Sequence, residues 1–274
     1  MPVAEVSGRQ LHYARRGEGE PLLLIQGLSG THASWGDTFL GALDPGLDLI
    51  MYDHRGIGGS GPSAGSFTIA ELAQDAAGLL EALGVERAHV LGISMGGMVA
   101  QELALDSPER VLTLALGCTY PGGPQSRLTD PASVQRIIAS FATGDRELIL
   151  RTSFELNVSP AYAAAPGAWE AFRANALQAP APMAVLIEQL RATAAHDASE
   201  RLGSLTVPTL VLHGDLDAIL DVSNGKLIAR LIHGAQLEIL EGIGHLFWLE
   251  DPERSAALLS AHVLSTAPAR PAGQ

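Results

Sequence analysis

The chain of 274 residues is 47% hydrophobic and has a formal net charge of −13. That length and composition allow one large buried core, which excludes disorder of the whole chain. The acidic balance gives no footprint for nucleic acid or for an anionic membrane surface, and the single cysteine, Cys118, excludes an internal disulfide. The amino-terminal residues lack the pattern of a signal peptide, and no apolar run approaches the ~20 residues that span a bilayer. We therefore expect a cytoplasmic enzyme or binding protein.

In chain order, short apolar runs alternate with amphipathic segments. The residues up to about 13 alternate in polarity and predict an antiparallel hairpin at the edge of a sheet. Later runs are almost continuously apolar, as the buried strands of parallel sheets are. They predict strands at residues 22–26, 47–52, 88–93, 111–117, 209–214 and 235–240.

Helix signals lie between these runs. Residues 68–84 open with a capping box formed by Thr68 and Glu71, and they close on Gly84. Asp251 followed by Pro252 predicts the start of a last helix. Strands that alternate with helices in this way predict an open, mostly parallel α/β sheet with helices on both faces.

Residues 122–200 break the alternation. They are rich in proline and in helical patterns, contain no convincing strand, and hold five of the chain's thirteen aromatic residues. We interpret this segment as a helical cap, or lid, inserted over one end of the sheet. The predicted core then consists of residues 1–121 and 201–274, with a mobile tail at 266–274.

Two serines stand in the pattern G-x-S-x-G, which by itself is weak because the chain contains 30 glycines. Ser63 lies in a loop rich in glycine, serine and proline. Ser94 instead follows the predicted strand 88–93 and precedes a helical pattern, which is the context of a nucleophile elbow. We therefore predict Ser94 as the nucleophile and Ser63 as a loop residue.

A serine nucleophile needs a base, and the base needs an orienting acid. His245 lies between the last predicted strand and the last helix, which would bring it to the same sheet edge as Ser94; His32 is a minor alternative. The other histidines fit structural roles. Asp215, Asp217 and Asp221 all follow strand 209–214, and any of them could supply the acid, although the first and last also fit turn and capping roles.

The order Ser94, Asp217, His245 resembles the α/β-hydrolase superfamily. The resemblance covers essentially the whole chain and rests on the motifs PLLLIQG, YDHRGIGGS, GISMGG, HGDLD and GIGH. It implies that Asp217 is the acid, because the family's acid usually stands three residues after the glycine that ends this strand. It also implies an oxyanion hole formed by the backbone N–H groups of Met95 and Leu28, and it implies no metal or organic cofactor.

Within the superfamily the sequence is similar to carboxylesterases, 3-oxoadipate enol-lactonases and acyl-homoserine lactonases. We expect a small-molecule carboxylic ester or lactone as substrate, held in a pocket lined by Gln26, Gly27, Trp35, Phe247 and Trp248. Relatives with His-Gly in the oxyanion loop differ from this chain at Gln26. We predict that this glutamine orients the loop through side-chain hydrogen bonds and does not itself stabilise the oxyanion.

Other functions remain open at this stage. A serine at the elbow disfavours haloalkane dehalogenases and epoxide hydrolases, which carry aspartate there. A hydrolase of carbon–carbon bonds, a cofactor-free perhydrolase, weakly suggested by Met95, and a receptor-like protein that binds a ligand without turnover are the alternatives.

Overall fold

The computed structural model describes residues 2–63 and 65–265, so the tail predicted at 266–274 lies outside the described residues. The described part contains a sheet of eight strands in the order β1-β2-β4-β3-β5-β6-β7-β8. The strands are β1 (Val3–Val6), β2 (Arg9–Arg16), β3 (Glu20–Ile25), β4 (Leu47–Tyr52), β5 (Ala88–Ile93), β6 (Val111–Gly117), β7 (Thr209–Gly214) and β8 (Gln236–Leu240).

The pairing of the strands confirms the predicted mostly parallel sheet. The hairpin of β1 and β2 is antiparallel, and β2 pairs antiparallel with β4. All the remaining pairs, from β4–β3 through to β7–β8, are parallel. The loops that follow the parallel strands therefore meet at one edge of the sheet, where ligands bind in open α/β sheets. Predicted boundaries shift by one or two residues: β3 begins at Glu20 and ends at Ile25, so Gln26 is the first residue of the loop, and β8 begins at Gln236.

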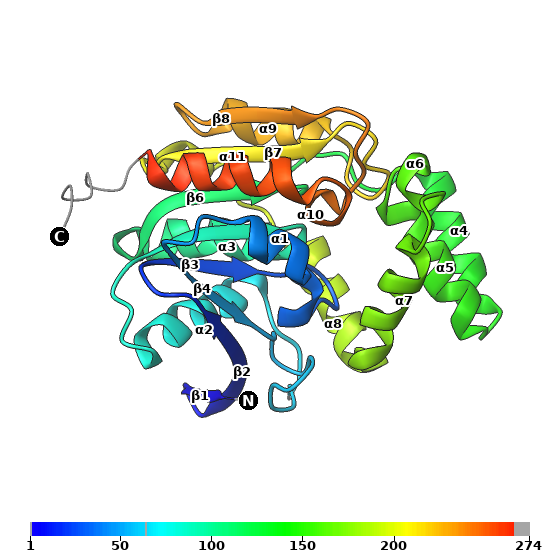
Figure 1. Cartoon of the computed structure of the whole chain (residues 1–274), viewed down its shortest axis with the longest axis horizontal. Coiled ribbons are helices and arrows are strands. Elements are labelled where there is room, and N and C mark those ends of the chain that lie inside the picture. Colours follow the sequence, from blue (N-terminus) through cyan, green and yellow to red (C-terminus); the bar gives the residue numbers. More distant parts are fainter. Residues whose placement is uncertain (1, 64, 266–274) are drawn as a thin grey trace.

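Helices cover both faces of this sheet, as predicted (Figure 1). The helices are α1 (Asp37–Ala42), α2 (Ile69–Ala82), α3 (Met95–Asp106), α4 (Pro131–Ala142), α5 (Arg146–Asn157), α6 (Pro160–Ala163), α7 (Ala168–Gln178), α8 (Met183–Ala195), α9 (Ser223–Leu231), α10 (Phe247–Glu250) and α11 (Pro252–Leu264). Short 3-10 helices occupy His32–Trp35, Pro108–Arg110 and Leu202–Ser204. Both predicted helix starts are confirmed: Thr68 and Glu71 form a capping box, and Asp251 caps α11 with Pro252 in its first turn.

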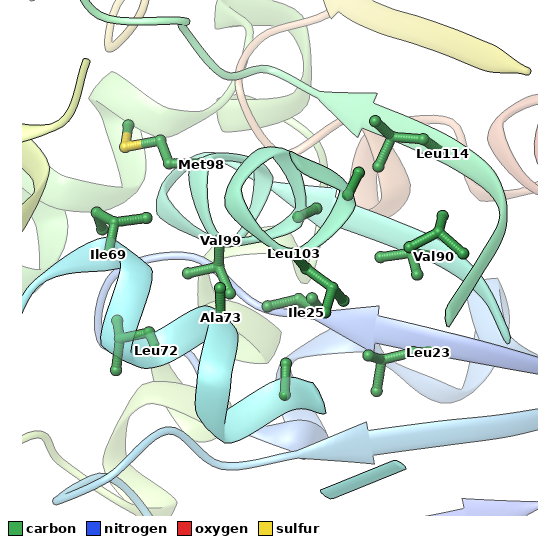
Figure 2. Packing of buried hydrophobic residues seen from close by; sticks show 14 of the residues in the cluster. Leu23, Ile25, Ile69, Leu72, Ala73, Val90, Met98, Val99, Leu103 and Leu114 are labelled. Atoms are coloured by element: carbon green, nitrogen blue, oxygen red, sulfur yellow. The ribbon is translucent and has the colours of Figure 1, made fainter. Parts of the chain in front are cut away.

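Two apolar layers hold the helices on the sheet. Along β3 the side chains alternate, so that Leu23 and Ile25 belong to one layer while Leu22 and Leu24 belong to the other. Figure 2 shows the first layer, in which side chains of α2 and α3 meet those of the strands, among them Val90. The second layer packs the opposite face against α1, α10 and α11. Burial on both faces explains why these strands are almost continuously apolar.

Five helices, α4 to α8, lie between β6 and β7, and no strand interrupts them within residues 118–208. In Figure 1, α4 to α7 extend from one end of the sheet, whereas α8 lies closer to it. Three of these helices share a small apolar cluster that includes the rings of Phe154, Trp169 and Phe172, and Leu246 packs against it. The helical content agrees with the predicted insertion, while its role as a separate cap stays a prediction. No helix in the described ranges is long and apolar enough to cross a membrane.

Candidate active site

Ser94 stands in a strained turn between β5 and α3. Its φ is 52° and its ψ is −124°. Residues other than glycine rarely adopt a backbone conformation with positive φ. The turn also requires small neighbours, because a Cβ at Gly92 would lie 2.2 Å from the carbonyl oxygen of Gly96. This is the strand-to-helix context predicted for Ser94. Ser63, in contrast, lies in a loop.

The loop after β3 passes directly beside Ser94. A Cβ at Gly27 would lie 3.0 Å from the Cβ of Ser94 and 3.6 Å from its Oγ. A Cβ at Gly96 would collide with the carbonyl oxygens of Ile25 and Gln26, at 2.2 and 2.5 Å. The two glycines therefore allow the first turn of α3 and the end of β3 to approach closely, and they bring the Leu28 backbone into the neighbourhood of the serine.

Asp217 and His245 form a buried hydrogen-bonded pair. The Nδ1 atom of His245 lies 2.7 Å from Asp217 Oδ2, and the two residues are 4% and 8% exposed, respectively. The second oxygen, Oδ1, accepts the backbone N–H groups of Ile219 and Leu220 at 2.8 and 2.9 Å. The loop after β7 therefore holds one carboxylate oxygen while the histidine binds the other.

The charge state of this pair follows from its contacts. Burial works to raise the pKa of Asp217, but the charges and hydrogen bonds of His245 and His213 outweigh it and hold that pKa well below its usual range. Because an ionised carboxylate only accepts hydrogen bonds, Nδ1 of His245 must carry the proton of their shared bond. The Nε2 atom of a neutral His245 is then free to accept a proton.

His213 was predicted to be a structural residue at the end of a strand, and the structure brings it into the same cluster. Its Nε2 atom lies 3.2 Å from Asp217 Oδ2 and 2.7 Å from the carbonyl oxygen of Leu220. Both partners are acceptors, so this nitrogen must be the protonated one. The sequence does not predict this contact between residues four apart, because the bend of the chain after Gly214 creates it.

Phe247 ties the His245 loop to the strands that lead to Ser94. A Cβ at Gly117, the last residue of β6, would lie 2.6 Å from the Phe247 ring and 3.0 Å from Ile93 Cγ2. The ring thus packs at the ends of β5 and β6, beside Ile93, which directly precedes Ser94. Phe247 itself lies two residues after His245.

The Ser94 hydroxyl makes no hydrogen bond to another residue in the described part of the chain.

Several backbone N–H groups near Ser94 have no acceptor among residues 2–63 and 65–265. They include that of Met95, at the start of α3, and that of half-buried Leu28. The turn from Gly27 to Gly30, closed by a 3.2 Å backbone hydrogen bond, holds Leu28 in place. The first N–H groups of any helix lack a partner within that helix, so the N–H of Met95 is available to a ligand oxygen, as is that of Leu28.

Gln26 is buried at the start of the same loop. Its Oε1 accepts the backbone N–H of Gly27 at 3.3 Å, and its backbone oxygen accepts a 2.9 Å hydrogen bond from Nε2 of His54. A Cβ at Gly30 would lie 2.7 Å from the same Oε1, so the side chain also packs against the far end of the turn. These contacts are of the kind expected if Gln26 orients the loop.

Glu250 joins the His245 loop to the helical insertion. Its Oε1 accepts the N–H of Gly244 at 2.9 Å, and its Oε2 accepts the N–H of Ser159 at 3.0 Å. Burial first, and then the negative charge of Asp217, raise the pKa of this carboxyl, although its hydrogen bonds oppose the rise. No spacing in the sequence pointed to this residue, since it lies inside a helical pattern.

The aromatic residues of the predicted pocket are buried in this structure. Trp35, Phe247 and Trp248 are 0%, 0% and 3% exposed and belong to the apolar layer beneath α1, α10 and α11. The Trp248 ring also contacts both of the others and donates from its indole N–H to the carbonyl oxygen of Ser34. Their large apolar surfaces fill the core, so they offer no surface to a ligand.

The competing acids and base have other partners. Asp215 is exposed and accepts the N–H of Gly242, while exposed Asp221 accepts the N–H of Ser223. His32 binds Asp53 through both its ring Nδ1 and its backbone N–H. These contacts match the turn and capping roles that the sequence allowed for Asp215 and Asp221.

Within residues 2–63 and 65–265, two clusters have donor sets that could hold a metal ion: His12, His32 and Asp53, and the cluster of Cys118 with Asp217 and His245. In the first, Asp53 accepts four N–H groups, from both rings and from the backbones of His32 and Gly59. Burial opposes them, but these bonds lower the pKa of Asp53 to about 2. Because the carboxylate oxygens of both clusters are already occupied, we interpret them as hydrogen-bonded clusters.

Comparison with known proteins gives a consistent picture. Residues 20–252 match the family model for the alpha/beta hydrolase fold. A putative carbamate hydrolase RutD of Azorhizobium caulinodans is 31% identical, with 92% of this chain and 94% of the relative covered. A hydrolase from Pseudomonas aeruginosa PA01 is 32% identical with a TM-score of 0.81, covering 96% and 97% of the two chains. Est816, described as an N-acyl homoserine lactone degrading enzyme, is 30% identical with a TM-score of 0.76, covering 94% and 98%.

Proposed function

The chain belongs to the alpha/beta hydrolase fold family, and we propose that it is a serine hydrolase that cleaves carboxylic esters or lactones through an acyl-enzyme intermediate. The observation that carries the proposal is the strained turn at Ser94, next to a sheet edge that also holds the buried Asp217–His245 pair. Backbone strain at a half-buried serine is retained where function requires that geometry.

In the first half of the proposed reaction, Ser94 Oγ attacks the carbonyl carbon of the substrate and its proton passes to Nε2 of His245. The carbonyl oxygen becomes an anion, which accepts hydrogen bonds from the N–H groups of Leu28 and Met95. The intermediate collapses, the bond from carbon to the leaving oxygen breaks, and His245 returns the proton to that oxygen. The products are an acyl ester of Ser94 and an alcohol, which in a lactone stays attached.

Water completes the cycle. His245 removes a proton from water, and the resulting hydroxide adds to the acyl carbon. When the second intermediate collapses, the bond from carbon to Ser94 Oγ breaks, the acid is released, and His245 returns the proton to Oγ. Asp217 does not take up the proton. Its ionised carboxylate holds Nδ1–H of His245 and stabilises the imidazolium that forms in each half-reaction.

The comparisons support a hydrolytic function. That the substrate is an ester or a lactone is our proposal. Est816, which is described as degrading N-acyl homoserine lactones, favours it. The carbamate hydrolase relative indicates that carbamates, whose carbonyl would be attacked in the same way, belong in any test. The helices α4 to α7, which we propose to act as the cap, would then lie over the entrance to Ser94.

The deciding experiment is a hydrolysis panel of straight-chain p-nitrophenyl esters, simple lactones, acyl-homoserine lactones, an enol-lactone, a carbamate and a vinylogous diketone. Wild type, Ser94→Ala and Ser63→Ala are compared, the last because it alters the second G-x-S-x-G serine. We expect ester or lactone turnover that Ser94→Ala lowers on the order of 10⁶-fold and Ser63→Ala leaves within twofold. Ester turnover that survives in Ser94→Ala, or turnover confined to the carbamate or the diketone, would overturn the proposal.

A further inference from the structure

Helix α8 is attached to three loops at the sheet edge that holds Ser94. After β3, the N–H of Ser29 donates to Gln189 Oε1 at 2.9 Å. After β4, a Cβ at Gly56 would lie 2.8 Å from a methyl group of Val185. After β6, the hydroxyl of Tyr120 donates to the carbonyl oxygen of Thr193. The helix therefore spans the loops of three separate strands, although it belongs in sequence to the helical insertion.

The contact to Ser29 is the one nearest the proposed chemistry. Ser29 follows Leu28, whose N–H we propose as an oxyanion donor, and it has a φ of 61°. A residue other than glycine in this left-handed region needs its surroundings to hold it there. Within the described ranges the side chain of Gln189 is the acceptor for the Ser29 N–H, and no part of that side chain is exposed.

The chemistry of the contact fixes the orientation of the glutamine amide. The backbone N–H of Ser29 is a donor, so the atom that faces it must be the oxygen, and the NH₂ group occupies the other position. That Nε2 is buried and has no partner in the described part of the chain. An apolar side chain of the same length would avoid an unpaired buried donor, so simple packing does not account for a glutamine at this position.

We propose that Gln189 is a positioning residue for the oxyanion loop. By accepting the N–H of Ser29, it holds this residue in its left-handed conformation and so directs the preceding N–H, that of Leu28, toward the carbonyl of a substrate bound at Ser94. The oxyanion hole is then complete only when α8 is seated on the loop. This inference rests on the proposed function, because it assigns Gln189 a role in that reaction.

Three variants test the proposal through steady-state kinetics on the best ester of the panel. Gln189→Met keeps the length of the side chain and removes the acceptor, Gln189→Glu keeps an oxygen for the Ser29 N–H, and Leu190→Ala changes the exposed neighbour on the same helix. A misdirected donor should cost less than a deleted one, which is worth ~10² to 10³ in kcat. We expect kcat to fall about tenfold in Gln189→Met with KM within twofold, to recover at least partly in Gln189→Glu, and to stay unchanged in Leu190→Ala.

Wild-type kcat in Gln189→Met, equal losses in Leu190→Ala, or a loss confined to KM would overturn the proposal. A second measurement does not depend on turnover: hydrogen exchange of the segment that contains Leu28 and Ser29. Exchange there should be faster in Gln189→Met and unchanged in Leu190→Ala and Ser94→Ala. If exchange responds as expected but the wild type hydrolyses no member of the panel, the proposed function fails while the structural role of Gln189 stands. Unaltered exchange in Gln189→Met refutes the role itself.

Discussion

His213 Nε2 lies 3.2 Å from Asp217 Oδ2, the same oxygen that binds His245. Asp217 Oδ1 therefore accepts two backbone N–H groups, while Oδ2 accepts the ring N–H of His245 and faces that of His213, which His213 shares with the carbonyl oxygen of Leu220. An acid held in this way has one orientation, and that orientation presents Oδ2 to His245.

Removal of the His213 donor should loosen this arrangement. In His213→Leu we expect kcat to fall roughly tenfold with KM little changed, because the carboxylate loses one of its four anchors. His213→Gln, whose Nε2 can occupy the position of the ring Nε2, should retain more activity. Thermal melting identifies any general loss of folding, and a leucine variant with wild-type kcat would show that His213 has no part in positioning Asp217.

Asp217 itself can be separated from its neighbour Asp215. An amide at position 217 would offer its NH₂ group to His245 and favour the wrong tautomer, so Asp217→Asn should lower kcat by about 10⁴. Asp215→Asn changes an exposed carboxylate that accepts the N–H of Gly242, and its kcat should stay within twofold of wild type. The comparison uses initial rates on the same ester. Equal losses in the two variants would contradict the assignment of the acid.

Gly27 should tolerate no added methyl group. Its φ lies outside the left-handed region, so any loss in Gly27→Ala comes from the methyl itself, placed 3.0 Å from Ser94 Cβ. We expect kcat/KM to fall tenfold or more while the protein still folds. Gly41→Ala, at an exposed position in α1, is the matched control, and it should keep full activity and gain up to ~1 kcal/mol of stability. Wild-type kinetics in Gly27→Ala would show that the loop lies farther from the serine.

Glu102, on α3, should contribute a pH-dependent part of the stability. Burial works to raise its pKa, but hydrogen bonds from His196 and Arg201 lower it to about 2. An acid whose pKa is depressed in the folded state stabilises the fold above its unfolded pKa, and this stabilisation is lost as the pH falls from about 4.5 to 2. Glu102→Gln should therefore cost on the order of 2 to 3 kcal/mol at pH 7.

The measurement is denaturant unfolding of wild type and Glu102→Gln at pH 7, 4 and 3, where the difference in the free energy of unfolding should shrink at each step. Glu81→Gln is the control. Its partner Arg110 lies 3.6 Å away and the Glu81 side chain is 76% exposed, so the change should cost less than about 0.5 kcal/mol at any of these pH values. A constant difference between wild type and Glu102→Gln would mean that charge is not the cause.

The sheet could be predicted from sequence because its evidence is periodic and local. Strands buried on both faces are almost continuously apolar. The capping box of Thr68 and the cap formed by Asp251 each involve residues that are close in sequence. The same holds for Ser94, since the strand, the glycines and the helix that define its turn are contiguous.

Contacts between distant segments could not be predicted in this way. Trp35, Phe247 and Trp248 were assigned to a pocket because they lie near site residues in sequence, yet their side chains fill the core. Nothing in the local sequence distinguishes His213 or Gln189 from packing residues. His213 contacts Asp217 because the chain bends after β7. Gln189 contacts Ser29 because α8 packs on a loop that lies 160 residues away in sequence.

The helical insertion is anchored to the site loops at several places. Helix α8 holds the loops after β3, β4 and β6. Asn175 of α7 binds Ser34 and Ala33, and the end of α5 accepts the N–H of Leu246, next to His245. A chimera that takes the insertion from another protein should therefore lose turnover even when it folds, unless the loops that face these helices are exchanged with it.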